Sequence, residues 1–194
     1  MLTLPNPEQL QEGVRMMIKG MGFSDTFIAE DQHLKDTPGR VARAWLETFV
    51  SGYSKNAEAI LQTQFIEENY QELIVVKNIP FYSTCVHHLV PFFGTATIGY
   101  IPDKSITGLS KLARIVDMFA RRLQIQERLT SEIAQAIEDV LKPKGVGVII
   151  TAEHLCMTSR GARSSGSVTT TSRLLGCLAE DPESRSEFLE LHGR

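Results

Sequence analysis

Two short clusters of cysteine and histidine have the residue types and the spacing to hold a metal ion. The run Cys85-Val86-His87-His88 places a thiol and an imidazole three residues apart, and His154-Leu155-Cys156 follows about seventy residues later. Catalytic zinc usually takes three protein ligands and leaves its fourth position for water. A Cys, a His and a Cys meet that requirement, and one histidine beside each cluster is then left for proton transfer. The spacing favours a catalytic zinc site.

Two other interpretations fit the same residues. Free cysteines are common in protein cores, and a lone Cys or His at such a spacing is more often structural than functional. A closed structural zinc site would use His87 or His154 as its fourth ligand. Spacing alone does not separate these alternatives from a catalytic site.

The first cluster follows a predicted strand. Leu73–Ile79 is rich in strand-forming residues and is followed by Pro80. A strand continuing through the cluster would point Cys85 and His88 to opposite faces. We therefore expect both residues to lie in a turn that brings them inward.

The second cluster continues another predicted strand. The apolar run Val146–Ala152 leads directly into His154 and Cys156. Because side chains alternate along a strand, residues two apart point to the same side. We therefore expect His154 and Cys156 to share one face, as a base and a ligand.

Cations and hydroxyl groups gather in two segments that could bind phosphate. Ser110, Lys111 and Arg114 lie at the start of a predicted helix, where backbone N–H groups favour anions. A solvated helix face is the commoner explanation of a pair such as Lys111 and Arg114. Arg160, however, follows the second metal cluster in a hydroxyl-rich stretch, which makes a phosphate site more credible.

Two further polar pairs have two interpretations each. Gln126 and Glu127 occupy the connection between two predicted helices. A carboxylate there is favoured by the helix dipole, but a carboxylate beside an amide could also recognise a guanine edge. Arg40 and Arg43, three residues apart on a predicted helix, are either surface charges or an anion clamp. Spacing does not decide between these roles.

Composition bounds the class of protein. A chain of 194 residues can bury one sizeable core, and a formal net charge of −3 gives no general reason to expect nucleic acid. Three cysteines and a start without a basic, apolar leader favour a reduced cytoplasmic compartment. No apolar run approaches the roughly 20 residues of a membrane helix. We expect a cytoplasmic protein that binds neither nucleic acid nor membranes.

The order of the predicted elements is typical of the α+β class. Two amphipathic helices come first, the second with Asp36 as a candidate N-cap and Pro38 in its first turn. Strands and helices then alternate in pairs. The predictions are helices over 7–22 and 36–52, strands over 73–79 and 92–101, helices over 109–123 and 129–141, strands over 146–153 and 166–174, and a short C-terminal helix or tail. We expect an N-terminal helical extension, 1–58, and a main domain, 59–194.

From Asp36 to the C-terminus the chain closely resembles the GTP cyclohydrolase I family. The matching motifs occur in the family's order. They are Phe81-Tyr82-Ser83-x-Cys85-x-His87-His88-Leu89-Val90-Pro91-Phe92, Tyr100-Ile101-Pro102, Gly108-Leu109-Ser110-Lys111-Leu112-x-Arg114, Gln126-Glu127-Arg128-Leu129-Thr130 and His154-x-Cys156-Met157-x-x-Arg160-Gly161. The resemblance implies the T-fold, an antiparallel sheet with a pair of helices on one side. It also implies a homodecamer of two pentamers, with sites between subunits and an inactive monomer.

The resemblance further implies a role for each site residue. Zinc would make water nucleophilic for attack on C8 of GTP, and the products would be formate and 7,8-dihydroneopterin triphosphate, the first step of pterin biosynthesis. Histidine suits the proton transfers because it titrates near neutral pH. The implied roles are zinc binding by Cys85, His88 and Cys156, proton transfer by His87 and His154, assistance at the ribose by Ser110, guanine recognition by Gln126 and Glu127, and triphosphate binding by Lys111, Arg114 and Arg160, with Arg40 and Arg43 from a neighbouring subunit.

Three residues depart from the family's pattern. Val86 stands where the family has glutamate, Thr95 where a lysine is usual, and Ser164 where an aspartate is common. Loss of a carboxylate beside His87 removes support for its charged form. Two alternatives to a working enzyme follow: a weak or inactive paralogue that binds zinc and guanine nucleotide, or a T-fold enzyme for another pterin or deazapurine. We favour the working enzyme, because the implied zinc ligands and both histidines are present.

Overall fold

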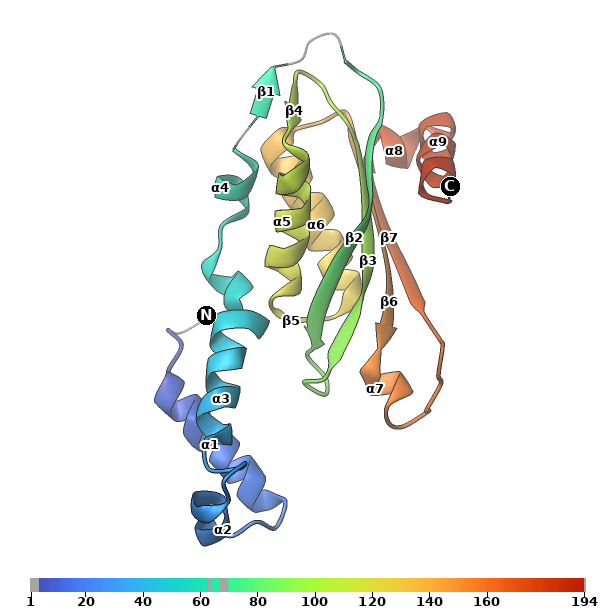
Figure 1. Ribbon diagram of the computed structural model, residues 1–194. Coiled ribbons are helices and arrows are strands. Elements are labelled where there is room, and N and C mark those ends of the chain that lie inside the picture. Colours follow the sequence, from blue (N-terminus) through green and yellow to red (C-terminus); the bar gives the residue numbers. More distant parts are fainter. Residues whose placement is uncertain (1–3, 63, 67–69, 194) are drawn as a thin grey trace. The chain divides into compact units, whose positions relative to one another are not determined.

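The computed structural model describes residues 4–62, 64–66 and 70–193, and the chain divides into two compact units (Figure 1). The units are Met1–Ser51 and Gly52–Arg194. Their boundary falls a few residues before the domain boundary predicted after residue 58. The outer ends of the two predicted domains, residues 1–3 and 194, lie outside the described residues.

The first unit is helical. Helix α1 is capped by Asn6, whose side chain accepts a hydrogen bond of 2.9 Å from the backbone N–H of Gln9. Val14 and Ile18, at the predicted helical spacing, pack with Ile28 in a small core, whereas Met17 and Met21 of the same predicted face are exposed. Its elements are α1 (Pro7–Gly20), α2 (Asp25–Glu30), α3 (Thr37–Ala44) and the π-helical turn η1 (Trp45–Phe49).

The second predicted helix of this unit differs in two details. Regular α-helix ends at Ala44, and a π-helical turn follows, so the predicted helix over 36–52 is shorter than expected. Asp36 takes the N-cap position, but its side chain makes no capping hydrogen bond. Its carboxylate instead accepts from Arg40 Nη2 at 3.2 Å, one helical turn away.

The second unit is built on a sheet of five strands in the order β5-β2-β3-β6-β7 (Figure 1). Its pairings are antiparallel except that of β5, which runs parallel to the end of β2. A separate pair joins β1 to β4. The elements are η2 (Ser51–Ser54), α4 (Ala57–Leu61), β1 (Gln64–Ile66), β2 (Ile74–Cys85), β3 (Pro91–Ile101), β4 (Ser105–Thr107), α5 (Leu109–Ala120), β5 (Leu123–Gln124), α6 (Gln126–Leu141), β6 (Gly145–His154), α7 (Leu155–Thr158), β7 (Thr169–Gly176), α8 (Cys177–Glu180) and α9 (Pro182–Gly193).

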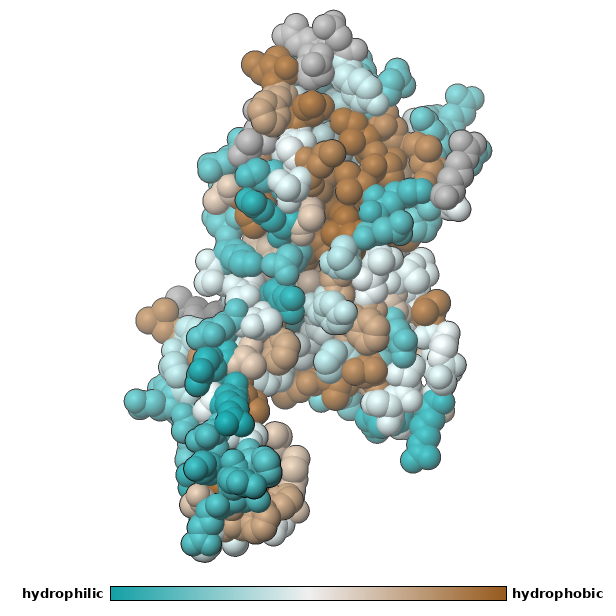
Figure 2. Space-filling model, in the orientation of Figure 1, coloured by the Kyte–Doolittle hydropathy of each residue, from teal (hydrophilic) through white to brown (hydrophobic). Residues whose placement is uncertain are grey.

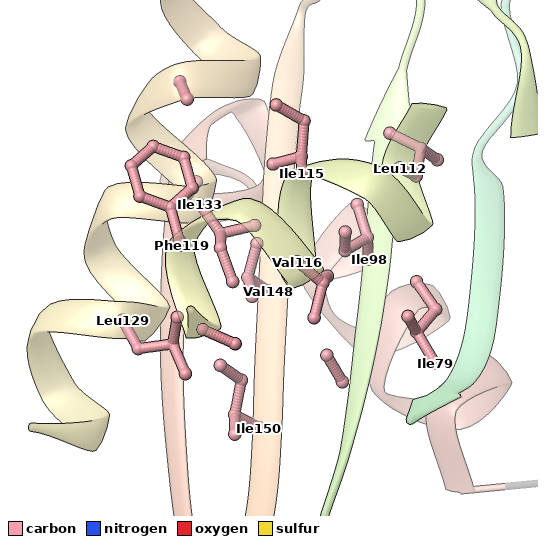
Figure 3. Packing of buried hydrophobic residues seen from close by; sticks show 14 of the residues in the cluster. Ile79, Ile98, Leu112, Ile115, Val116, Phe119, Leu129, Ile133, Val148 and Ile150 are labelled. Carbon is pink, nitrogen blue, oxygen red and sulfur yellow. The ribbon is translucent and has the colours of Figure 1, made fainter. Parts of the chain in front are cut away.

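Helices α5 and α6 cover one face of this sheet and form the main core with it (Figure 3). Ile115 and Ile133 point from the two helices toward Val148 and Ile150 on β6, and all four side chains are fully buried. Burying side chains of this size stabilises the fold by roughly 1.5–3 kcal/mol each. The predicted α+β class, with the helix pair of the T-fold on one side of an antiparallel sheet, is confirmed.

The opposite face of the sheet is partly covered by the C-terminal helix α9. Gly99 and Gly147 are paired across β3 and β6, and the fully buried ring of Phe188 lies over both. A Cβ atom at either glycine would lie 2.6 Å from that ring. His192 Nδ1 and Thr97 Oγ1 are 3.0 Å apart nearby. Because both glycines lack a side chain, the ring of Phe188 can pack directly on the backbone of β3 and β6 and so hold α9 against the sheet.

Several other predicted boundaries were wrong. The helix predicted over 109–123 ends at Ala120, and the strand predicted over 166–174 spans Thr169–Gly176. The predicted strand 73–79 continues through Pro80 to Cys85. Pro80 pairs with Thr95 on β3, and the described partner of β2 on its other side, β5, meets only Thr84 and Cys85. A proline is tolerated there because no ladder hydrogen bond is needed from its missing N–H. Gln126, predicted in a connection, instead begins helix α6.

The surface of the second unit carries apolar residues at the end formed by β1 and β4 (Figure 2). Phe65 and Ile66 on β1 are 56% and 82% exposed. Among the described residues, no helix is long and apolar enough to cross a membrane.

Candidate active site

The first metal cluster is held by a tight turn between β2 and β3. The backbone N–H of Cys85 donates to the carbonyl of Val90, and that of Leu89 donates to the carbonyl of Cys85, both at 2.9 Å. Leu89 takes the left-handed conformation, with φ of 55°, to close the turn. The N–H of Val86 donates at 3.0 Å to the carbonyl of Gln124 on β5. His88 thus lies in a turn as predicted, whereas Cys85 is the last residue of the strand.

The second cluster lies where β6 ends. His154 is the last residue of the strand and pairs in register with Phe92 on β3. Cys156 lies in the short helix α7, so the prediction that it continues the strand and shares a face with His154 by alternation was wrong. Cys156 nevertheless lies close to Cys85 at the end of β2, with one strand, β3, between β2 and β6 in the described sheet.

One ligand atom from each of Cys85, His88 and Cys156 lies within 4.8 Å of the other two. The three residues therefore form a candidate metal site, although Cys156 lies about seventy residues after Cys85 and His88 in the sequence. His87 lies beside it, with Nδ1 3.9 Å from Cys85 Sγ. Arg160 Nη1 and His88 Nε2 are 2.8 Å apart. Because a guanidinium only donates, Nε2 of His88 accepts this hydrogen bond.

The electrostatic state of the thiols depends on what lies beside them. Burial raises the pKa of the Cys156 thiol, and the nearby Cys85 raises it further, while the cation of Arg160 acts in the opposite direction. Two thiolates side by side repel one another. A bound cation would remove that penalty, because metal ligation requires deprotonated cysteine.

A cavity of about 210 Å³ adjoins the metal cluster. It brings together predicted residues of several roles: two predicted ligands, both histidines predicted to transfer protons, and the pair predicted to recognise guanine. The lining residues are Cys85, His87, Gln124, Ile125, Gln126, Glu127, His154, Cys156, Met157 and Thr169.

His154 is held on two sides within this cavity. Its ring stacks on the fully buried Phe92, with the centroids 4.7 Å apart and the planes 3° from parallel. Its Nε2 is 2.7 Å from Gln126 Oε1. Burial lowers the pKa of His154, because the charged ring loses hydration, and the carboxylate of Glu127 partly offsets that effect.

Other predicted residues of the second unit lie away from this cavity. Ser110, Lys111 and Arg114 lie on the first turns of α5. The turn that contains His88 is bonded instead to β5, which follows the end of α5. From Ser110 to the end of α5 the rise is roughly 15 Å. Figure 1 shows the start of α5 near β4 and its end near β5. These three residues and the metal cluster thus occupy opposite ends of the helix layer.

Arg40 and Arg43 lie in the first unit. Both line a cavity of about 290 Å³ together with Gln11, Lys35, Asp36 and Gly39. Asp36 pairs with Arg40, and the remaining cations of the cavity make it a polar, positively charged hollow.

Two contributors to the site were not predicted. Phe92 was part of a recognised motif, but its stacking on His154 depends on the register of β3 and β6, which no local pattern encodes. Gln124 is almost fully buried, and its side chain bonds Phe119, Arg128 and Glu132. A glutamine between two helical patterns was the available signal.

The three departures from the family pattern occupy exposed positions. Val86 is 38% exposed at the start of the metal turn. Thr95 lies on the sheet face opposite α5 and α6, because its neighbour Ala96 faces the core. Ser164 lies in the loop after α7, and its N–H donates to the carbonyl of Met157 at 3.2 Å.

Comparison with known proteins gives consistent matches over nearly the whole chain. The model of a family described as GTP cyclohydrolase I matches residues 10–193. GTP cyclohydrolase 1 of Thermobifida fusca is 54% identical over 185 residues, which cover 94% of this chain and 86% of that protein. GTP cyclohydrolase 1 of Streptococcus agalactiae is 45% identical over 189 residues, 97% of this chain and 98% of that protein.

The structural comparison includes the apo form of the archaeosine synthase QueF-Like. That structure has a TM-score of 0.45 and 16% sequence identity to this chain. The match covers 54% of this chain and 93% of that chain.

A third sequence relative, GTP cyclohydrolase 1 of Chlorobium phaeovibrioides, is 48% identical over 184 residues, which cover 95% of this chain and 80% of that protein. With a family match over so much of its length and the family's motifs in order, the chain belongs to the GTP cyclohydrolase I family.

Proposed function

We propose that this protein hydrolyses and rearranges GTP to 7,8-dihydroneopterin triphosphate and formate, the first step of pterin biosynthesis, at a zinc centre. Family membership supports GTP cyclohydrolase activity. One observation carries the assignment of the centre: Cys85 and Cys156 belong both to the candidate metal cluster and to the cavity that contains Glu127 and His154.

The donor atoms suit zinc. Two thiolates and one imidazole favour zinc or iron over magnesium, which prefers oxygen ligands. Sulfur atoms on a tetrahedral zinc, with Zn–S bonds of about 2.3 Å, are separated by roughly 3.8 Å. The three candidate ligand atoms all lie within 4.8 Å of one another, which is at most about 1 Å beyond that spacing. When bound, zinc supplies a Lewis acid that makes water nucleophilic near neutral pH.

The chain's own residues would bind the guanine ring and move protons. Glu127 presents an exposed carboxylate to the cavity from the first turn of α6, where it can accept hydrogen bonds from the N–H donors of guanine. His87 and His154 flank the cavity and can deliver protons to the imidazole ring of GTP and remove them from attacking water. Triphosphate binding is assigned to Lys111, Arg114 and Arg160.

A complete site would need more than one copy of the chain. Ser110, assigned to the ribose, and Lys111 lie at the far end of α5 from the metal cluster, so their counterparts in a neighbouring subunit would serve this cavity. We therefore propose a decamer of two pentamers with sites between subunits, and Arg40 and Arg43 contributed in the same way. A cytoplasmic location, without membrane or nucleic-acid partners, stays a prediction from composition.

The proposed assembly can be tested by mixing two inactive variants. Lys111→Ala damages the phosphate side of the site, and Cys156→Ser the metal side. If each site uses both residues from different chains, co-assembled subunits regain some intact sites and a fraction of the activity. Mixtures as inactive as either parent, with mixed assembly verified by mass, would contradict sites between subunits.

The activity itself is tested with purified, zinc-loaded protein and GTP. Formate and the fluorescent neopterin formed after oxidation are measured together. Release of both in equal amounts supports the cyclohydrolase. Binding of zinc and GTP without either product would instead favour a catalytically weak paralogue.

Val86 motivates that second candidate, because a valine cannot support the charge of His87 as a glutamate would. The two candidates predict different results for Val86→Glu. A working enzyme changes its rate little, whereas a weak paralogue gains turnover from a baseline near zero. A product other than neopterin triphosphate from the wild-type chain would favour a T-fold enzyme for a different pterin or deazapurine.

A further inference from the structure

We propose that Gln126 is a positioning residue: its side-chain oxygen fixes the proton of the neutral His154 ring on Nε2 and leaves Nδ1 as the ring's basic atom. The use of that basic atom in catalysis rests on the proposed function. The state of the ring itself follows from the hydrogen bonds around Gln126.

The orientation of the Gln126 amide is set by two backbone carbonyls. The side chain is only 2% exposed, and its Nε2 is 2.9 Å from the carbonyl oxygens of both Ile150 on β6 and Thr169 on β7. Carbonyl oxygens only accept hydrogen bonds, so the amide nitrogen must face them. The flipped orientation would place the amide oxygen against these two acceptors and would require the hydroxyl of Thr171, 3.1 Å away, to donate to it.

A chain of hydroxyl groups excludes Thr171 as that donor. Thr130 Oγ1 donates to the backbone carbonyl of Gln126 at 2.7 Å, which uses its one proton. Thr171 Oγ1, 2.6 Å from Thr130 Oγ1, must therefore donate to it. With its own proton used, Thr171 can only accept at its 3.1 Å contact with the side chain of Gln126. The donor in that contact is Gln126 Nε2, whose two N–H protons are shared among Ile150, Thr169 and Thr171.

The amide oxygen is then left facing His154. Gln126 Oε1 lies 2.7 Å from His154 Nε2, and an amide oxygen cannot donate. The hydrogen bond therefore requires a proton on Nε2, and the neutral ring keeps its lone pair on Nδ1. The parallel stack on Phe92 holds the ring plane in which this hydrogen bond is made. Histidine tautomers are commonly selected in this way by the partner of one ring nitrogen.

The same contacts change the role expected for Gln126. Its N–H donors face Ile150, Thr169 and Thr171, and its oxygen accepts from His154, so this side chain has no free donor for a guanine ring and is only 2% exposed. Guanine recognition by this pair then falls to Glu127, which is exposed in the cavity.

The direct test is ¹⁵N NMR of the full-length, assembled protein labelled at its five histidines. The signals of His154 are identified by their loss in His154→Gln, at a pH where the ring is neutral. Protonated and unprotonated ring nitrogens have well-separated ¹⁵N shifts. We expect the Nε2–H tautomer in the wild-type protein, and a dominant Nδ1–H tautomer would overturn the proposal without any variant.

The variant test uses Gln126→Met, which keeps the length of the side chain but removes its oxygen. We expect a mixture of tautomers and a kcat lowered about 10- to 100-fold, the range found when a partner that orients a functional histidine is lost. KM for GTP should change by less than about twofold, because no contact with substrate is removed. Gln135→Met is the matched control, since Gln135 is an exposed residue of the same helix.

Two results would contradict the positioning role. One is a pure Nε2–H tautomer retained in Gln126→Met. The other is a raised KM with unchanged kcat, which would make Gln126 a reader of guanine. If the wild-type protein releases no formate, the proposed function fails, but the ¹⁵N spectrum still decides the tautomer.

Discussion

Replacing Gly147 with alanine should destabilise the protein through a residue of a different element, Phe188. The new Cβ would lie 2.6 Å from Cε1 of the ring and 2.9 Å from Cδ1 and Cζ. Ordinary contacts of a Cβ begin at 3.4 Å, so the ring must move by nearly 1 Å. A Cβ atom built on Gly99 would likewise lie 2.6 Å from the other edge of the ring, so the ring already packs closely against both glycines.

The size of the effect follows from this crowding. Forcing an additional methyl group into a packed core costs about 1–3 kcal/mol. Removing the ring instead, in Phe188→Ala, should cost about 3–5 kcal/mol because the side chain is fully buried. In the double variant the new methyl group of Gly147→Ala enters space that the ring has left. The second substitution should then cost almost nothing, with a coupling of roughly 1–3 kcal/mol between the two sites.

Urea unfolding of the wild-type protein, the two single variants and the double variant measures this coupling. The free energies of unfolding are obtained by linear extrapolation at one protein concentration, because assembly makes stability depend on concentration. Gly13→Ala is the matched control. Gly13 lies inside α1 with open space around it, so alanine there should raise stability by about 0.5–1 kcal/mol.

Additive effects of Gly147→Ala and Phe188→Ala would refute the proposed contact. So would a Gly147→Ala variant as stable as the wild-type protein. Hydrogen exchange over residues 182–193 gives a second measurement, since displacement of the ring should expose α9 before the rest of the fold opens.

Two further predictions concern the metal and the pH dependence of stability. Cys156→Ser should abolish zinc retention after dialysis, whereas His154→Ala should keep the zinc and lower kcat by roughly 10²- to 10⁴-fold. Metal analysis measures the zinc content of each variant, and the formate assay measures its rate. Loss of zinc from His154→Ala would make His154 a ligand. Asp117 accepts from Lys55 Nζ at 3.0 Å and Arg121 Nε at 3.1 Å. Burial alone would raise the pKa of this carboxyl, but the two cations outweigh it and hold the pKa below the usual 3.8. The pairing therefore stabilises the folded state at pH values above the pKa that Asp117 has in the unfolded chain. This stabilisation is lost as the pH falls through the lower pKa of Asp117 in the folded protein. Asp117→Asn should flatten the decline of the urea midpoint below about pH 4, and equal slopes in both proteins would contradict this.

The helices were predictable because their evidence is local. Val14 and Ile18 repeat at the helical period, and both lie in the core of the first unit. The candidate metal cluster was predictable for a similar reason, since Cys85 and His88 are close in sequence and a thiol near an imidazole is a specific chemical signal. Those features need no knowledge of the rest of the chain.

What could not be predicted depends on pairings between distant segments. Pro80 was expected to end a strand, and only the pairing of β2 shows that its missing N–H is not needed. The stack of Phe92 on His154 depends on strand register. The amide of Gln126 is occupied by groups on β6 and β7, which the sequence places more than twenty residues away. The residue types of the candidate site could be identified from the sequence, but the hydrogen bonds within it could not be predicted.

The positions of the two cysteines have a consequence for the chain as a whole. Cys85 and Cys156 enclose about seventy residues, which include β3, both core helices and β6. A zinc ion bound to both would therefore act as a cross-link that limits the freedom of the unfolded chain. A covalent link closing a loop of that length lowers the entropy of the unfolded state by an equivalent of about 4 kcal/mol. Chelation should then lower the thermal stability of the entire second unit, and heat resistance would report the metal content of the protein.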